Sequence, residues 1–116
     1  MRVSNQKINP SLEKQILSEL IKTLADLKSA KEIQTFLVDF FNESELETFA
    51  KRLAVAYWLK KGRSYNNIKD NLKVSSATVA TVQATLETPG IKLALKKLEA
   101  DEWANQWTEK IKKIIK

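Results

Sequence analysis

The chain has 116 residues, and its 20 Lys and Arg against 14 Asp and Glu give a net charge of +6. This length corresponds to a single domain. The chain has no Cys and no His, which excludes disulfides, thiol nucleophiles, Cys/His zinc sites and histidine acid–base chemistry. We therefore expect a binding protein, with no enzyme activity, no cofactor and no metal site.

No apolar run approaches the ~18–20 residues that are needed to span a membrane. The polar start of the chain, residues 1–10, lacks the apolar core of a signal peptide. We therefore expect no membrane span and a cytoplasmic location. The excess of basic over acidic residues indicates an anionic polymer or surface as the partner.

The positive charge is concentrated in one stretch. Residues 51–73 hold seven basic side chains and one acidic one, Asp70, whereas residues 1–50 carry a net charge of −2 and residues 74–116 of +2. Such a run is usually a solvated helix face. Its concentration favours a binding surface over that interpretation.

Helical periodicity begins near Ser11. An apolar stripe predicts a helix over residues 11–28 with Ser11 as its cap; the stripe is Leu12, Ile16, Leu17, Leu20, Ile21, Leu24 and Leu27. Ser29 and Glu32 fit a capping box that opens a second helix, to about residue 41. Ser44 and Glu47 fit another box, which opens a third helix that ends at Gly62.

Two short helices are expected after Gly62, capped by Ser64 and Ser75 and joined by Lys73-Val74-Ser75. Two short helices with such a link are typical of a helix-turn-helix. Its shared core would consist of Ile68, Leu72, Val74, Val79 and Val82. Lys73 stands where a left-handed backbone favours Gly, at a cost of ~1 kcal/mol. The alternative is three short helices of a generic bundle.

The second of these helices would be the recognition helix in the major groove. Its exposed face is small or hydroxylated, with one amide, and has no Lys or Arg; it consists of Ser76, Ala77, Ala80, Thr81, Gln83 and Ala84. Such side chains allow close approach to base edges. Affinity would come from phosphate contacts by a basic cluster made of Lys60, Lys61, Arg63, Lys69 and Lys73.

Pro89-Gly90 is expected to end that helix, and residues 91–116 form a basic amphipathic segment, with Asp101 as the candidate start of a second piece. Its apolar residues are Leu95, Leu98, Trp103, Trp107, Ile111, Ile114 and Ile115. Three interpretations remain open: packing against the rest of the protein, a helix for a partner or second subunit, and a membrane-surface anchor.

The segment from Asn42 to Pro89 resembles the Trp repressor superfamily, through the run "ESELETFAKRLAVAYWLKKGRSYNNIKDNLKVSSATVATV". Within it the chain is most similar to the Trp-repressor-related regulators of the YerC/YecD type, which share "KGRSYNNI"-like and "SSATV" segments. The resemblance implies an operator contact at Lys69 and recognition-helix contacts at Ser76, Ala77 and Ala80.

The resemblance also places Arg52, Thr78 and Thr85 at positions that surround tryptophan in the repressor. Thr81 and Val82 depart from the family, because they replace the second Arg that sandwiches the indole and the Gly beside it. Loss of a charge-assisted contact costs ~1.5–3 kcal/mol, so we expect no tryptophan response. The sequence does not identify another small-molecule effector.

The resemblance further implies a homodimer with interleaved N-terminal helices and a roughly palindromic operator. We therefore expect one all-α, Trp-repressor-like domain over residues 1–116, with dimerisation helices at 11–41, a helix-turn-helix core at 44–88 and the C-terminal segment at 91–116. The predicted function is sequence-specific binding of double-stranded DNA by a transcriptional regulator, acting as a repressor. The alternative is a helical protein-interaction or dimerisation module without specific DNA binding.

Overall fold

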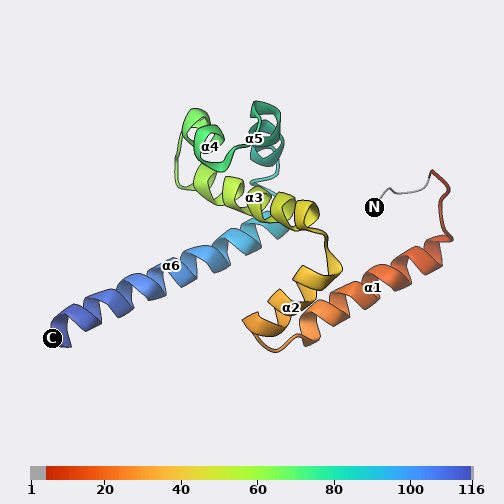
Figure 1. The fold of residues 1–116 in the computed structure, drawn as a ribbon, viewed down its shortest axis with the longest axis horizontal. Coiled ribbons are helices and arrows are strands. Elements are labelled where there is room, and N and C mark those ends of the chain that lie inside the picture. Colours follow the sequence, from red (N-terminus) through yellow and green to blue (C-terminus); the bar gives the residue numbers. More distant parts are fainter. Residues whose placement is uncertain (1–4, 116) are drawn as a thin grey trace. The chain divides into compact units, whose positions relative to one another are not determined.

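The computed structural model describes the backbone of residues 5–115 and the side chains of residues 5–105. The described residues form helices and no strand, which confirms the all-α prediction (Figure 1). The helices are α1 (Pro10–Asp26), α2 (Ala30–Phe40), α3 (Glu43–Lys60), α4 (Tyr65–Leu72), α5 (Ser76–Gln83) and α6 (Pro89–Ile115). None of them is both long and apolar enough to cross a membrane, as far as the described residues extend.

The chain divides into two compact units, Met1–Leu46 and Glu47–Lys116. The first unit contains α1 and α2. No residue of these two helices is buried, although α1 carries the predicted apolar stripe and α2 carries Ile33, Val38 and Phe40. Leu17, Ile21 and Phe40 are more than half exposed, so the apolar faces of this unit have no cover within it.

The caps of α1 and α2 follow from short-range hydrogen bonds. The prediction that Ser11 caps α1 is wrong: Asn9 is the cap, and its side chain accepts a hydrogen bond from the Ser11 backbone N at 2.8 Å. At α2 the predicted cap is confirmed, since Ser29 Oγ accepts from Glu32 N at 3.2 Å, but the return bond of the predicted box goes to the residue before the cap. Glu32 Oε1 in turn accepts from Lys28 N at 3.0 Å.

The start of α3 lies two residues before the predicted capping box. Asn42 Oδ1 accepts from Glu45 N at 2.8 Å, and Glu45 Oε1 accepts from Asn42 N at 3.0 Å. The prediction of Ser44 and Glu47 is therefore wrong, because Asn42 already closes the reciprocal pair of bonds that defines such a box. Ser44 lies inside the helix.

The end of α3 is a glycine cap, as predicted. Gly62 has a φ of 84°, which glycine adopts without a Cβ penalty. Gly62 N donates to Leu59 O at 3.0 Å, and Arg63 N donates to Trp58 O at 3.1 Å. These two bonds are those of a Schellman motif, and they turn the chain sharply into α4.

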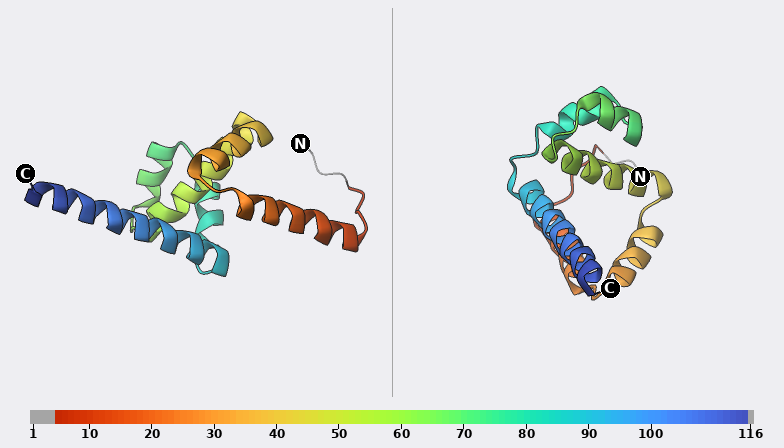
Figure 2. Two further views of the ribbon diagram at one scale, coloured as in Figure 1. Left: turned by 90° about the horizontal axis from the view of Figure 1, so that it is seen from below. Right: turned by 90° about the vertical axis from the view of Figure 1, so that its left-hand side faces the viewer.

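The second unit has a continuous core. Its buried residues come from α3, α4, α5 and α6, and they are Val55, Ala56, Ile68, Val79, Val82 and Leu95. Leu72 and Val74 pack against this core, so the five positions expected for a helix-turn-helix do pack together. In Figures 1 and 2, α4 and α5 lie on one side of α3 and α6 lies on the other.

The link between α4 and α5 has the expected backbone. Lys73 is left-handed, with φ 57° and ψ 50°, and it is the only non-glycine residue with positive φ among the described residues. The Oγ atoms of Ser64 and Ser75 cap the two helices by accepting from Asn67 N and Thr78 N, both at 3.1 Å. Both predicted caps are confirmed.

Helix α6 starts at Pro89 rather than after it. Lys92 N donates to Thr88 O at 3.0 Å, so Pro89 and Gly90 occupy the first turn, where a missing N–H costs nothing. The helix is continuous to Ile115, so the suggested restart at Asp101 is wrong. The predictions for the side chains of Trp107, Ile111, Ile114 and Ile115 lie outside the described residues.

Candidate nucleic-acid interface

Helix α5 presents the surface that the sequence assigned to base contacts. Ser76, Ala77, Ala80 and Thr81 are all exposed, whereas Val79 and Val82 point into the core. The helix therefore has a buried apolar side and an exposed side of small or hydroxylated residues, as predicted. The exposed side carries no charge, and Thr81 Oγ1 is turned back to the Ala77 carbonyl at 2.8 Å.

The basic cluster spans the end of α3, helix α4 and the link to α5. Lys60 and Lys73 are exposed, and Lys69 on α4 is half-buried. Arg63 lies with its guanidinium 4.0 Å from the centre of the Trp58 ring, and its Nη1 is 3.4 Å from Asn67 Oδ1. A stacked Arg keeps its charge while its orientation is restricted.

Lys61 is the member of the basic cluster that has a counter-ion. Its Nζ lies 2.8 Å from Glu102 Oε2 on α6 and 5.4 Å from the centre of the Tyr57 ring. The Tyr57 hydroxyl donates to the same Oε2 atom. Hydrogen bonds from Lys61 and Tyr57 lower the pKa of Glu102, and the bond to Glu102 raises the pKa values of Lys61 and Tyr57.

A hollow of about 430 Å³ lies beside the start of α5. It brings together Arg52, Thr78 and Thr81, three of the positions discussed for tryptophan, and adds Lys51 and Lys73. Thr85 does not line it; its hydroxyl donates to Val82 O at 2.7 Å. Val82 lines the hollow from α5.

Two of the three cations that line this hollow, Lys51 and Arg52, have neighbours on α3. Arg52 lies with its guanidinium 5.6 Å from the centre of the Phe49 ring. Lys51 Nζ is 3.1 Å from Glu47 Oε1, one helical turn away. Arg52 is the one guanidinium among the residues that line the hollow. No second guanidinium faces the hollow from α5, because the described part of α5 holds no charged side chain.

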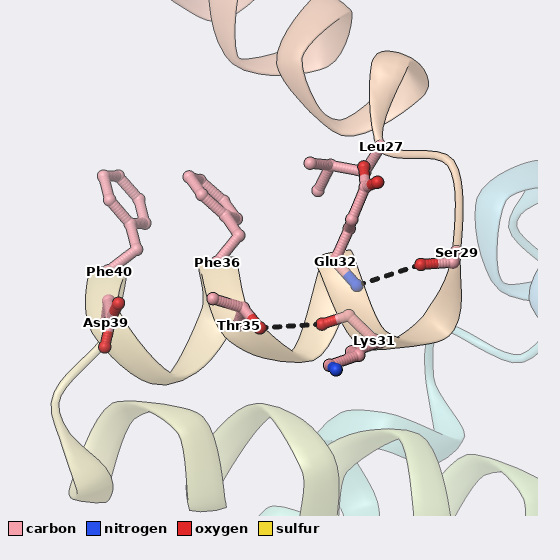
Figure 3. Close-up of a pocket in the computed structure, with 8 residues that line it drawn as sticks. All are labelled: Leu27, Ser29, Lys31, Glu32, Thr35, Phe36, Asp39 and Phe40. Atoms are coloured by element: carbon pink, nitrogen blue, oxygen red, sulfur yellow. Dashed lines mark hydrogen bonds between the residues drawn. The ribbon is translucent and has the colours of Figure 1, made fainter.

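A second hollow, of about 660 Å³, lies in the N-terminal unit between the end of α1 and α2 (Figure 3). Phe36 and Phe40 point to the same side of α2 and stack at 4.9 Å between ring centres, and Leu27 lies on that side too, above Glu32. Polar residues, among them Lys31 and Asp39, border it. This hollow is an open apolar surface inside the segment that was predicted to dimerise.

Sequence reasoning missed two features of the interface. The stacking of Arg63 on Trp58 was foreseeable, because a Schellman turn at Gly62 brings the residue after it back over the last turn of α3. The pairing of Lys61 with Glu102 had no local signal, since the two residues are distant in the chain. Among the described residues, no group of three or more potential ligands is placed to hold a metal ion.

Comparison with known proteins gives two matches. The Trp repressor protein family matches residues 15–99. The chain is also 31% identical over 70 residues to the Uncharacterized protein YerC of Bacillus subtilis (strain 168), an alignment that covers 60% of this chain and 67% of that protein. No solved structure matches the chain.

Proposed function

The chain belongs to the Trp repressor family, a family of helical DNA-binding regulators, and we propose that it binds double-stranded DNA sequence-specifically as a transcriptional repressor. The proposal rests above all on one observation: α5 exposes an uncharged face, and the segment just before it carries the basic cluster of Lys60, Lys61, Arg63, Lys69 and Lys73. We propose the cytoplasm as the location of this regulator.

In this proposal α4 and α5 act as a helix-turn-helix. The first turns of α5 enter the major groove, where Ser76, Ala77, Ala80 and Thr81 meet base edges and thymine methyl groups. The basic cluster supplies the cations for phosphate contacts, which fix the register of the helix without reading sequence. Affinity is then dominated by phosphates and depends strongly on salt.

We further propose a homodimer built through residues 11–41. The support is that the first unit buries no residue of α1 or α2 by itself, although Ile16, Leu20 and Leu24 line one face of α1. Exposed apolar surface of this extent is typical of an interface. Two copies would place two α5 helices about one DNA turn apart, ~34 Å, on a near-palindromic operator, and bound protein would occlude a promoter sterically.

Tryptophan is not the proposed effector. The hollow beside α5 is bordered by one guanidinium, from Arg52, and Thr81 and Val82 line it from α5. A carboxylate that entered it would lack the second planar cation, which is worth ~1.5–3 kcal/mol. The proposed regulator therefore binds its operator equally with and without tryptophan.

The proposal is tested by selecting bound duplexes from a random library and measuring how the affinity for the selected duplexes depends on salt. Lys69→Ala should weaken binding to every sequence and lower the slope of log K against log salt by about one. Ala80→Glu should abolish specific binding while the helix content of the protein is unchanged. Normal binding by the Ala80→Glu variant would show that α5 is not the recognition helix.

A helical protein-interaction module is the second candidate, and the exposed apolar faces of α1 and α2 favour it. The two candidates differ in one inexpensive measurement. A DNA-binding protein binds random duplex with a steep salt dependence, whereas an interaction module does not bind it at all at physiological salt.

A further inference from the structure

The Tyr57–Lys61–Glu102 cluster joins the proposed DNA surface to α6. Lys61 lies between Lys60 and Arg63 in the basic cluster, yet its Nζ is 2.8 Å from Glu102 Oε2. Tyr57, one helical turn earlier on α3, donates its hydroxyl to the same oxygen. Glu102 therefore accepts two hydrogen bonds from the end of α3, and these orient its carboxylate toward Lys61.

The other lysines of the basic cluster differ from Lys61. The structure records no ion pair for Lys60, Lys69 or Lys73 with any described residue, whereas the Lys61 charge is cancelled locally by Glu102. A neutral pair does not attract a polyanion at a distance. Lys61 thus contributes less to the field of the basic cluster than its neighbour Lys60 does.

The ion pair between Lys61 and Glu102 is also weak enough to break. The Lys61 and Glu102 side chains are 41% and 39% exposed, and ion pairs at this exposure are weak and are screened by salt. A DNA phosphate and the Glu102 carboxylate are competitors for the same ammonium group, because both are anionic oxygen acceptors.

We propose that Glu102 is a positioning residue that withholds Lys61 from the DNA backbone, so that α6 sets how many cations of the basic cluster are available to phosphate. This inference rests on the proposed function. Its consequence is regulatory: any partner or movement that takes Glu102 away from the end of α3 adds one phosphate contact and tightens binding to all sequences alike.

The experiment is a double-mutant cycle on DNA binding, with random duplex at 50–200 mM salt as the probe. Glu102→Gln removes the charge and keeps an acceptor for Tyr57. It should steepen the salt slope by about 0.9, the value of one added phosphate contact. Between 50 and 200 mM salt, the affinity of the variant should then fall about threefold more than the affinity of wild type does. Lys61→Ala should leave the slope unchanged in wild type and lower it by about 0.9 in the Glu102→Gln background.

Two controls separate this effect from general changes in charge. Glu99→Gln removes an acidic charge from the same helix, where no ion pair to the basic cluster is recorded, and should leave the slope as in wild type. Lys60→Ala should lower the slope by about 0.9 in both backgrounds. Circular dichroism of each variant identifies any loss of folding, and the Lys61→Ala and Lys60→Ala pair tests the proposal without altering Glu102.

The outcomes are distinct. If wild-type protein does not bind duplex, the proposed function fails. If wild type binds and Lys61→Ala lowers the slope as much as Lys60→Ala does, Lys61 is already at a phosphate and the inference is overturned. The inference is equally overturned if Glu102→Gln behaves like Glu99→Gln.

Discussion

The two units of the chain differ in how much of their apolar surface is buried. In the second unit Val55, Ile68 and Val79 are fully buried, and four helices contribute to one core. In the first unit the stripe of α1 and the aromatic side chains of α2 form no core, and Phe40 is 59% exposed. The proposed DNA-binding surface therefore lies on a unit with its own core, whereas the helices of the proposed dimer interface have no core of their own.

The largest expected effect is on the first unit. Ile16→Asp places a charge in the middle of the α1 stripe, where burial against a second copy would strip its water. We expect the dimer to dissociate to monomer and DNA affinity to fall by about 100-fold or more, since a dimer engages two half-sites at once. Sedimentation equilibrium and duplex binding measure the two effects.

The matched control is Ser18→Asp, which adds the same charge to the polar side of α1. It should leave both the mass and the DNA affinity as in wild type. A wild-type protein that is monomeric at all concentrations, or an Ile16→Asp variant that remains dimeric, contradicts the proposed role of residues 11–41.

The second effect is on the core of the second unit. Ile68→Ala removes a fully buried side chain from α4, and large-to-small changes of this kind cost about 2–5 kcal/mol. Ile8→Ala is the same substitution at an exposed residue before α1, and its effect should stay within about 0.5 kcal/mol. Urea unfolding compares them, and equal costs would mean that burial in the second unit is not what stabilises it.

A smaller effect is expected at the α4–α5 link, where one substitution should change stability and DNA binding in opposite directions. Lys73→Gly relieves the left-handed backbone at φ 57° and should raise the free energy of unfolding by about 1 kcal/mol. It also removes a cation, so the salt slope of DNA binding should fall by about 0.9. Lys69→Ala should lower the slope without the gain in stability. A less stable Lys73→Gly variant would contradict this account.

The smallest effect is a titration within the second unit. Tyr57 and Tyr65 are the two tyrosines of the chain, so a Tyr65→Phe variant reports on Tyr57 alone by ultraviolet absorbance. The bond to Glu102 raises the pKa of Tyr57 above its usual value near 10. Glu102→Gln should bring the midpoint back down, and an unchanged midpoint would show that the hydrogen bond is absent in solution.

The signs of these shifts define a pH window for the cluster. The pKa of Glu102 is lowered by folding, so its contribution to stability is present above its ordinary pKa and is lost as pH falls through the folded value. The pKa values of Tyr57 and Lys61 are raised, so their contributions are lost as pH rises through theirs. The cluster is therefore complete at neutral pH.

Much of this fold was predictable because its signals are local. Apolar spacing located the helices, and Ser29, Ser64 and Ser75 cap the helices that follow them. The left-handed Lys73 was predicted from the position of the link alone. These features depend on neighbours within one helical turn, which a single sequence displays directly.

The errors at helix starts have a common cause. Asn9 stands two residues before Ser11, and Asn42 two residues before Ser44, and in both places the earlier Asn caps the helix. Asn and Ser are nearly equal as caps, so the pattern of residue types could not rank them. Pro89 was assigned as a stop, although proline also favours the first helical position.

The candidate site was less predictable than the fold. Charge and exposure identified α5 and the basic cluster, but the neutralisation of Lys61 depends on how α6 crosses the end of α3. Helix periodicity gives the face of each helix and not its crossing with another. Glu102 could therefore be placed on α6 from sequence, but not against Lys61.

The absence of charge on α5 bears on how the protein would search a genome. If every cation that meets DNA contacts phosphate, operator and random sequence lose the same number of counterions on binding. Their affinities would then fall in parallel as ionic strength rises, and the ratio between them would stay constant. A rise in salt concentration would change how much of the protein is bound, while the choice among sites would depend on van der Waals contacts and ordered water at α5.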